Sequence, residues 1–363
     1  MKKILKKFIP NFILDLKEKI KHDIYKDKIQ NFAIYFNKNK RDELKEDYNN
    51  FFFEIKNTKF VSSRGILNST NIHNQIQYAN HKSVSIKEIN KILPNDSLYI
   101  CSDALINFSK KTIENIKVPF ILVSGNSDLE ISPNTIGDKN FYKILNYSFL
   151  KKWFAQNLSF KNKKIINLPI GLDYQSESQG NHKIGKNRRL PFDQEQLLIK
   201  TLAESKKIDD RKFKIYSNWH FLISPERVDC LKNIDKSLCY FEEKRKYRDV
   251  TWKKQSEFTF VLCPAGFGLD THRIWESMIL GSIPIVKNNG IVNLFHDLPI
   301  IIVDDWSDIN NDYLQNRYKR IINDHFNFSP LFLKYWQKKI NNDETNYDLK
   351  PMTLKEFKTF LSN

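Results

Sequence analysis

One stretch constrains the fold of this chain more than any other: FTFVLCPAGFGLDTHRIWESMILGSIPIVK, from Phe258 to Lys287. Phe258–Cys263 is an almost wholly apolar run, which is typical of a parallel strand buried on both faces. Ser282–Lys287 has the same character, and Thr271–Leu280 between them has the length and spacing of a helix. The stretch is therefore predicted to be one β-α-β unit.

The segment that joins the first strand to the helix consists mainly of turn residues. Pro264 ends the strand, and Gly266 and Gly268, with Phe267 between them, predict a turn whose backbone can approach a ligand closely. Asp270 is placed to cap the start of the helix. Loops at the carboxyl ends of parallel strands are where open α/β sheets bind ligands, so this loop is a candidate binding site.

The first turn of that helix carries two basic residues, His272 and Arg273. Cations at the amino end of a helix are unfavourable by roughly 0.3–1 kcal/mol each, and the backbone N–H groups there are unpaired. A bound phosphate or diphosphate would remove both costs. Glu276 lies one turn later on the same face, where it could accept hydrogen bonds from a ribose. The alternative is a glycine turn, an Arg273–Glu276 surface pair and a buried helix.

Two familiar nucleotide sites are excluded by the residues around this loop. A dinucleotide fingerprint requires glycine or alanine where this chain has Thr271, and an acid where it has Val286 and Lys287. A P-loop requires a Gly-Lys-Ser/Thr sequence, and none follows. The predicted anion site therefore belongs to another class.

The ordered set PAGFGLDTHRIWESMILGSIPIVK, followed by LPIIIVDDWSDI (Leu298–Ile309), resembles the C-terminal half of exostosin-like glycosyltransferases. That family has a Pro-x-Gly-x-Gly loop, then an Arg-x-x-Glu helix, then Gly-x-Ile-Pro-Val/Ile. The resemblance implies a GT-B fold, a nucleotide-sugar donor held by the C-terminal domain, and inversion at the anomeric carbon. It also implies that Gly266, Gly268 and Arg273 contact the diphosphate and Glu276 the ribose, and it favours a UDP-sugar.

The length of the chain and the alternation of its elements predict two domains. A chain of 363 residues is long for one core, and strands alternate with helices through both halves. We expect an α/β, GT-B-like fold with two doubly wound, Rossmann-like domains facing a central cleft. The predicted parts are an acceptor-side domain over 1–180, a donor-binding domain over 181–330, and C-terminal helices over 331–363. The resemblance to GT-B enzymes implies that a terminal helix crosses back to the first domain.

The first domain is predicted from short apolar runs separated by polar loops. Ser97–Cys101, Phe120–Val123 and Lys164–Leu168 are expected to be strands. Asn140–Phe154 is expected to be a helix. Phe51–Val61 is expected to be a strand, Ser62–Asn71 a polar loop and Tyr174–Arg189 the linker between domains.

Further donor-binding candidates come from the second domain. Asn218 follows a predicted strand over Phe213–Tyr216, Arg227 belongs to a predicted helix over Glu226–Ile234, and Arg248 belongs to one over Arg245–Ser256. The alternative for each arginine is a surface position without a ligand.

The acids of the chain indicate transfer without a metal ion. There is no Asp-x-Asp triad, and Asp209-Asp210 and Asp304-Asp305 are adjacent pairs, whose side chains point to opposite faces of a strand. We therefore expect no cofactor and no metal, with Arg273 and the helix terminus stabilising the departing diphosphate. Inversion needs one general base. Asp128 after the second strand is the first choice, and Asp103 and Asp173 have similar positions; the alternative for each is a turn or capping residue.

The net charge of +17 predicts anionic partners. An acidic glycan or an anionic membrane surface agrees with that charge, and no nucleic-acid motif is present. The basic start of the chain, residues 1–28, is interpreted either as an amphipathic segment on a membrane or as a solvated helix. Four widely spaced cysteines indicate a reducing compartment, so we expect a cytoplasmic protein, peripheral on a membrane.

The sequence therefore predicts a glycosyltransferase of polysaccharide biosynthesis that moves a sugar from a nucleotide donor to a glycan or glycolipid acceptor. The alternative is a non-enzymatic, basic protein that binds anions or nucleic acid.

Overall fold

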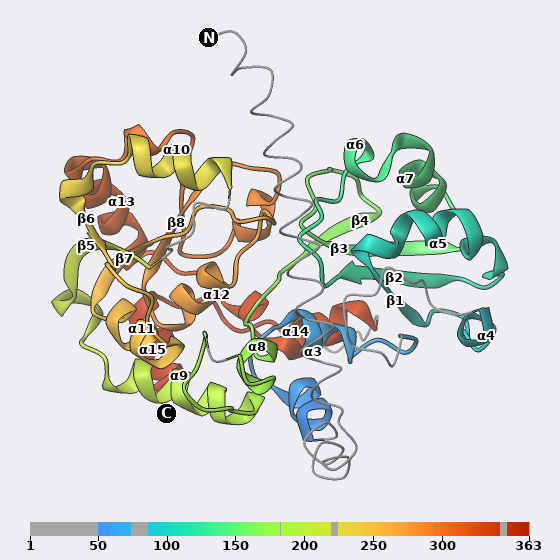
Figure 1. Ribbon diagram of the computed structural model, residues 1–363, viewed down its shortest axis with the longest axis horizontal. Coiled ribbons are helices and arrows are strands. Elements are labelled where there is room, and N and C mark those ends of the chain that lie inside the picture. Colours follow the sequence, from blue (N-terminus) through green and yellow to red (C-terminus); the bar gives the residue numbers. More distant parts are fainter. Residues whose placement is uncertain (1–49, 74–85, 182, 219–223, 342–346, 363) are drawn as a thin grey trace, which may run out of the picture. The chain divides into compact units, whose positions relative to one another are not determined.

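Two parallel sheets, built one after the other along the chain, form the framework of the computed structural model (Figure 1). The structure describes residues 50–73, 86–181, 183–218, 224–341 and 347–362. Residues 52–363 form one unit that contains both sheets. The predicted α/β class with two parallel sheets is confirmed.

The first sheet has its four strands side by side in chain order. They are β1 (Ser97–Cys101), β2 (Phe120–Gly125), β3 (Leu150–Gln156) and β4 (Ile165–Leu168). Every residue of β2 is buried, as expected for a parallel strand covered on both faces. Helices α5 (Leu105–Lys111) and α7 (Asp138–Leu145) add Phe108, Phe141 and Ile144 to the core beside this sheet.

The second sheet has the order β6-β5-β7-β8-β9, and all its pairs are parallel. Its strands are β5 (Lys212–Ser217), β6 (Cys239–Phe241), β7 (Phe258–Leu262), β8 (Ile283–Lys287) and β9 (Ile301–Val303). The chain places β6 on one side of β5 and then β7 on the other. The order of the strands therefore reverses between β5 and β7.

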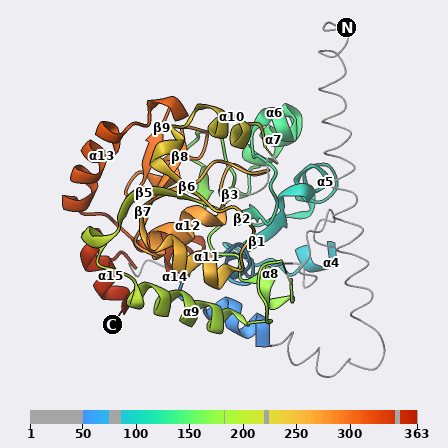
Figure 2. The same cartoon turned by 60° about the vertical axis from the view of Figure 1, so that its left-hand side comes forward.

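The remaining helices surround these sheets. α9 and α15 are neighbours, and both views of the molecule show them side by side (Figures 1 and 2). The bounds are α3 (Ser63–Leu67), α4 (Ile86–Ile89), α6 (Pro133–Ile136), α8 (Gln175–Ser178), α9 (Pro191–Glu204), α10 (Pro225–Asn233), α11 (Arg248–Gln255), α12 (His272–Ile279), α13 (Asn311–Asn323), α14 (Leu333–Ile340) and α15 (Leu354–Ser362).

The β-α-β unit predicted over Phe258–Lys287 is present as β7, α12 and β8. All residues of β7 are buried, and α12 buries Trp275 and Met278 among others. Gly281 has a φ of 71°, the left-handed conformation that closes many helices and that glycine adopts without strain. The fold of this unit is therefore determined locally by its own sequence pattern.

The helix predicted over Asn140–Phe154 is wrong, because α7 ends at Leu145 and β3 begins at Leu150. Leu150, Trp153 and Phe154 have the i, i+3, i+4 spacing of a helix stripe, which explains the error. In the structure Trp153 pairs with Leu122 of β2, so pairing with a neighbouring strand decided the conformation.

The predictions for Phe51–Val61 and Ser62–Asn71 are also wrong. Residues 50–57 are helical, and α3 occupies the expected polar loop with all its residues buried. Backbone bonds from Val61 N to Leu331 O (2.9 Å) and from Leu333 N to Lys59 O (3.0 Å) join this region to the start of α14. The residue bounds of the predicted domains stay a prediction.

Candidate functional site

The reversal of strand order in the second sheet places two loops at the carboxyl ends of neighbouring strands. Asn218 directly follows β5, and the segment from Cys263 to Thr271 follows β7. In open α/β sheets the crevice beside the carboxyl ends of such strands is where ligands bind. Asn218 and the glycine loop therefore follow neighbouring strands, and their role in donor binding stays a prediction.

Arg273 is the second residue of α12 and is held by Asn218. Its Nε donates to Asn218 Oδ1 at 2.6 Å, and none of the described acids forms an ion pair with it within 4.0 Å. The side chain is neither buried nor fully exposed. Asn218 thus orients the guanidinium without neutralising it.

Arg227, on α10, is a second cation at the same loop. Its Nε donates to Ala265 O at 3.3 Å, and only 8% of its surface is exposed. Burial and then the charge of Arg273 lower the pKa of Arg227 to about 10. Arg227 is thus anchored at the segment that follows β7, and Arg273 is anchored at the residue that follows β5.

Gly268 is required by a close approach rather than by an unusual φ. Among the described glycines, positive φ angles occur at positions outside this loop. A Cβ on Gly268 would lie 3.1 Å from Asn157 Nδ2 and 3.3 Å from Asp128 Cα. Gly266 N donates to Gly268 O at 3.1 Å, which tightens the turn around the partly exposed Phe267. The loop therefore packs against the loops that follow β2 and β3.

Asp270 does not cap α12, so the predicted role is wrong. The cap position is Thr271, and the Asp270 carboxylate accepts bonds from Ile170 N (2.7 Å) and Trp275 Nε1 (2.9 and 3.1 Å). Burial raises the pKa of Asp270 to about 6, although these bonds act in the opposite direction. Asp270 instead ties the loop to the segment after β4.

His272, the first residue of α12, contacts that same segment. Its Nδ1 lies 2.6 Å from Gly171 O. A carbonyl oxygen only accepts hydrogen bonds, so Nδ1 carries the proton and Nε2 remains for a ligand. Gly171 has a φ of 64°, and a Cβ there would lie 2.1 Å from Val61 O, so glycine is required.

Arg248 has a different environment from the other two arginines, since it is surrounded by acids. It lies 3.0 Å from Asp173 Oδ2, 3.9 Å from Glu177 Oε2 and 3.8 Å from Glu276 Oε1. Its side chain is 9% exposed, and it also donates to Gln194 Oε1 at 3.0 Å. Burial alone would lower the pKa of Arg248, but the three acids raise it. This arrangement is that of a structural ion-pair cluster, so neither predicted alternative describes Arg248 well.

Asp173 and Glu276 belong to the same cluster. Burial alone would raise the pKa of Asp173, but the charges of Arg248 and His272 hold it well below its usual range. A carboxylate so stabilised is a poor proton acceptor, which disfavours Asp173 as the general base. Glu276, the fifth residue of α12, is 14% exposed on its side chain, and its predicted contact with a ribose stays a prediction.

The two other acids proposed as bases follow β1 and β2. Asp103 accepts a bond from Ser127 Oγ at 2.6 Å. Asp128 is exposed, and its backbone lies against Gly268. The structure therefore brings Asp103 and Asp128 to one loop region, with Asp128 nearer to the glycine loop.

Asn157 and Gln156, at the end of β3, were not predicted as site residues. Asn157 is 1% exposed, donates to Ser127 O (3.0 Å) and accepts from Asp270 N (2.9 Å). Gln156 accepts from Asn126 N at 2.8 Å and donates to Pro169 O at 2.8 Å. The sequence signal for these residues is a polar pair that follows an apolar run, as at the end of a buried strand. The prediction of a helix over Asn140–Phe154 hides this signal.

Two broader predictions concern membranes and metals. Of the described helices, none is long and apolar enough to span a membrane. Residues 1–28 lie outside the described part of the chain, so the amphipathic interpretation stays a prediction. Within the described residues no three His, Cys, Asp or Glu side chains are grouped so that they could hold a metal ion.

Comparison with known proteins gives structural matches only. No model of a protein family matches the chain, and no curated protein does. A crystal structure of an alpha1,3-fucosyltransferase is 12% identical, with 79% of this chain and 94% of that chain covered and a TM-score of 0.33. The same type of enzyme with GDP-fucose is 13% identical (78% and 98% covered, TM-score 0.31), and with GDP it is 12% identical (77% and 96% covered, TM-score 0.33). Likeness at this level carries no inference about activity, and the resemblance to exostosin-like enzymes stays a prediction.

Proposed function

We propose that this chain is an inverting, metal-independent glycosyltransferase that moves a sugar from a nucleoside diphosphate to a glycan or glycolipid acceptor. A UDP-sugar is the favoured donor. The observation that carries the proposal is the position of two arginines where the strand order reverses: Arg273 lies in the first turn of α12, and Arg227 bonds to Ala265 O in the segment after β7. The proposed place of action is the cytoplasmic surface of a membrane, in polysaccharide synthesis.

The charges of Arg227, Arg273 and the amino end of α12 favour a ligand with two negative charges. Arg227 is almost buried, and burial together with the charge of Arg273 lowers its pKa, so an anion bound here would stabilise the charged form of both arginines. The first N–H groups of α12 add positive potential at the same place. A diphosphate would compensate all three, and His272 Nε2 could bond to a phosphate oxygen or a sugar hydroxyl.

The chemistry follows from this arrangement. The bond between the sugar C1 and the diphosphate oxygen breaks while the acceptor oxygen bonds to C1 from the opposite side. Arg227, Arg273 and the helix N–H groups stabilise the negative charge that develops on the departing diphosphate. A metal ion would supply the same stabilisation, so the cations make it unnecessary.

The acceptor must lose a proton, and we assign this step to Asp128. It is exposed, adjoins the glycine loop, and comes from the first sheet, opposite the proposed donor site. Asp103 is the second choice because Ser127 already bonds to it. Asp128→Asn should slow turnover about 10²- to 10⁴-fold and leave nucleotide affinity unchanged.

Titration calorimetry with UDP, GDP, ADP and CMP, in the presence of a chelator, tests the proposal. We expect UDP to bind most tightly, and Arg273→Ala to weaken it about 10- to 100-fold, since a hydrogen bond between charged groups contributes about 1.5–3 kcal/mol. Arg317→Ala, on α13, is the matched control. Absence of nucleotide binding, or binding of unrelated polyanions with a steep dependence on salt, would support a non-enzymatic anion-binding protein instead.

A further inference from the structure

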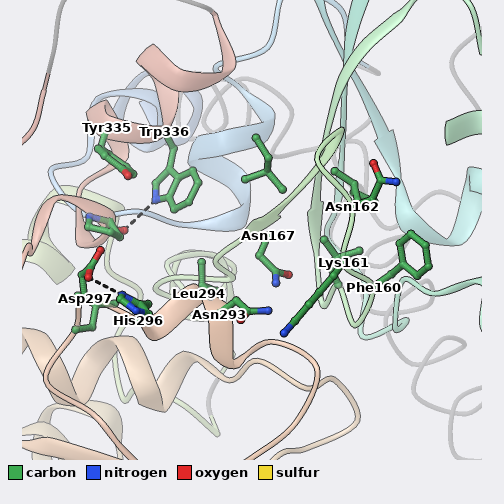
Figure 3. Close-up of a pocket in the computed structure, with 15 residues that line it drawn as sticks. Phe160, Lys161, Asn162, Asn167, Asn293, Leu294, His296, Asp297, Tyr335 and Trp336 are labelled. Carbon is green, nitrogen blue, oxygen red and sulfur yellow. Dashed lines mark hydrogen bonds and ion pairs between the residues drawn. The ribbon is translucent and has the colours of Figure 1, made fainter. Parts of the chain in front are cut away.

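A pocket of about 370 Å³ lies between three segments, and none of the donor-site residues lines it (Figure 3). The segments are residues 158–167, residues 293–298 and the start of α14. The volume lies within the range of about 300–1,000 Å³ that is usual for small-molecule sites. In Figure 3 the side chains of Asn167, Asn293 and Lys161 extend toward the same space.

Three side-chain amides line the pocket, and they make few hydrogen bonds to other described residues. Among the described residues, Asn167 Oδ1 is a buried oxygen without a hydrogen-bond partner, and the exposed Asn293 makes no side-chain hydrogen bond. Asn162 accepts from Lys164 N at 2.8 Å through Oδ1, which leaves its two N–H donors. The pocket therefore offers several uncharged donors and acceptors to a ligand.

The remaining walls are mostly apolar. The indole of Trp336 donates its N–H to Pro330 O at 2.9 Å, so it presents carbon surface to the pocket. Leu294 and Ile166 also line it. Apolar walls with a few fixed polar groups are typical of sites for small polar molecules.

The charged side chains that line the pocket all belong to exposed residues. Asp297 pairs with His296 at 2.7 Å, and both side chains are well exposed (66% and 86%). Lys161 is also exposed. A single exposed lysine is a weak anion site, and a purely apolar ligand would leave the amides without partners.

We propose that this pocket binds a neutral sugar unit of the acceptor glycan, remote from the point of transfer. This inference rests on the proposed function. Sugar hydroxyls would pair with the amides of Asn167 and Asn293, and the apolar face of the ring would pack on the carbon walls. Asn167 precedes Gly171, which contacts His272, by four residues, so chain geometry limits their separation to about 14 Å. A glycan of a few units can span that distance.

Saturation-transfer NMR with lactose, maltotriose and chitotriose, and with a chondroitin disaccharide as the acidic probe, tests this site. We expect at least one neutral probe to bind. Asn293→Trp, which fills the pocket, and Asn167→Leu, which removes an amide, should each weaken it at least tenfold. Asn323→Trp, at the end of α13, is the control and should leave it unchanged.

The outcome is separable from that of the donor site. Calorimetry with UDP should give the same affinity in Asn293→Trp as in the wild type, which also shows that the variant is folded. Binding of none of the neutral probes, binding of the acidic probe alone, or neutral binding that persists in both pocket variants would overturn the proposal. Absence of UDP binding in the wild type, with neutral sugars still bound at the pocket, would instead overturn the proposed function and the role of the pocket in glycosyl transfer, but not the sugar site itself.

Discussion

Two arginine environments in the second half of the chain lead to different conclusions. Arg248 lies among three acids and has a raised pKa, whereas Arg227 lies beside another arginine and has a lowered one. A buried cation whose charge is compensated by the protein contributes to the fold. Two cations whose charges act against each other, such as Arg227 and Arg273, are candidates to bind a ligand of opposite charge. Basic residues therefore have to be distinguished by their neighbours, which the sequence does not reveal.

Of the substitutions that test this comparison, Arg248→Met is expected to lower the free energy of unfolding most. The substitution would leave Asp173, Glu177 and Glu276 without their shared cation in a largely buried place. Removal of one partner from a buried ion pair costs about 3–5 kcal/mol. Urea unfolding should show this loss, and Arg317→Met should not. Unchanged stability in Arg248→Met would contradict the claim that the ion pairs of Arg248 stabilise the fold.

A smaller effect is expected from Gly268→Ala. The new Cβ would lie 3.1 Å from Asn157 Nδ2 and 3.2 Å from Oδ1, so the loop has to shift. Overpacking of this kind costs about 1–3 kcal/mol. Thermal unfolding and UDP affinity should both decrease, and Asn157→Ala in the same chain should recover part of the stability. If Gly268→Ala alone matches the wild type in both assays, the close approach has no importance for the site.

The smallest effect is a dependence on pH at Asp173. Its folded-state pKa lies below the ordinary value of 3.8, so its ionised form stabilises the fold above that value and this contribution is lost as the pH falls. The wild type should therefore lose its stability advantage over Asp173→Asn as the pH is lowered from about 5 to about 2. An advantage that stays constant over this range would contradict the ion pair with Arg248.

The second half of the chain could be predicted well from its sequence, and the first half less well. The β7-α12-β8 unit has unbroken apolar runs and local end signals, so its pattern suffices. β3 was missed because Leu150, Trp153 and Phe154 are compatible with a helix, and only pairing with β2 excludes one. α3 was missed because its burial depends on residues far along the chain, near Leu331.

Only the part of the candidate site that depends on local sequence patterns could be named in advance. Arg273 and Asn218 were both named from sequence, and the structure joins them. The buried bonds of Asn157 and Asp270 connect residues that lie 100 and 113 positions apart in the sequence, so no local pattern could indicate them. The structural role of Arg248 likewise depends on acids from three different segments, which no local pattern brings together.

The central claim is tested most directly by thermal unfolding of the wild type and Arg273→Met, each with and without UDP. An uncompensated cation should be dispensable for folding, so the free variant should unfold at the same temperature as the wild type or higher, because the repulsion of Arg227 is relieved. UDP should raise the unfolding temperature of the wild type only. A variant that is strongly destabilised without ligand, or that still responds fully to UDP, would contradict the account.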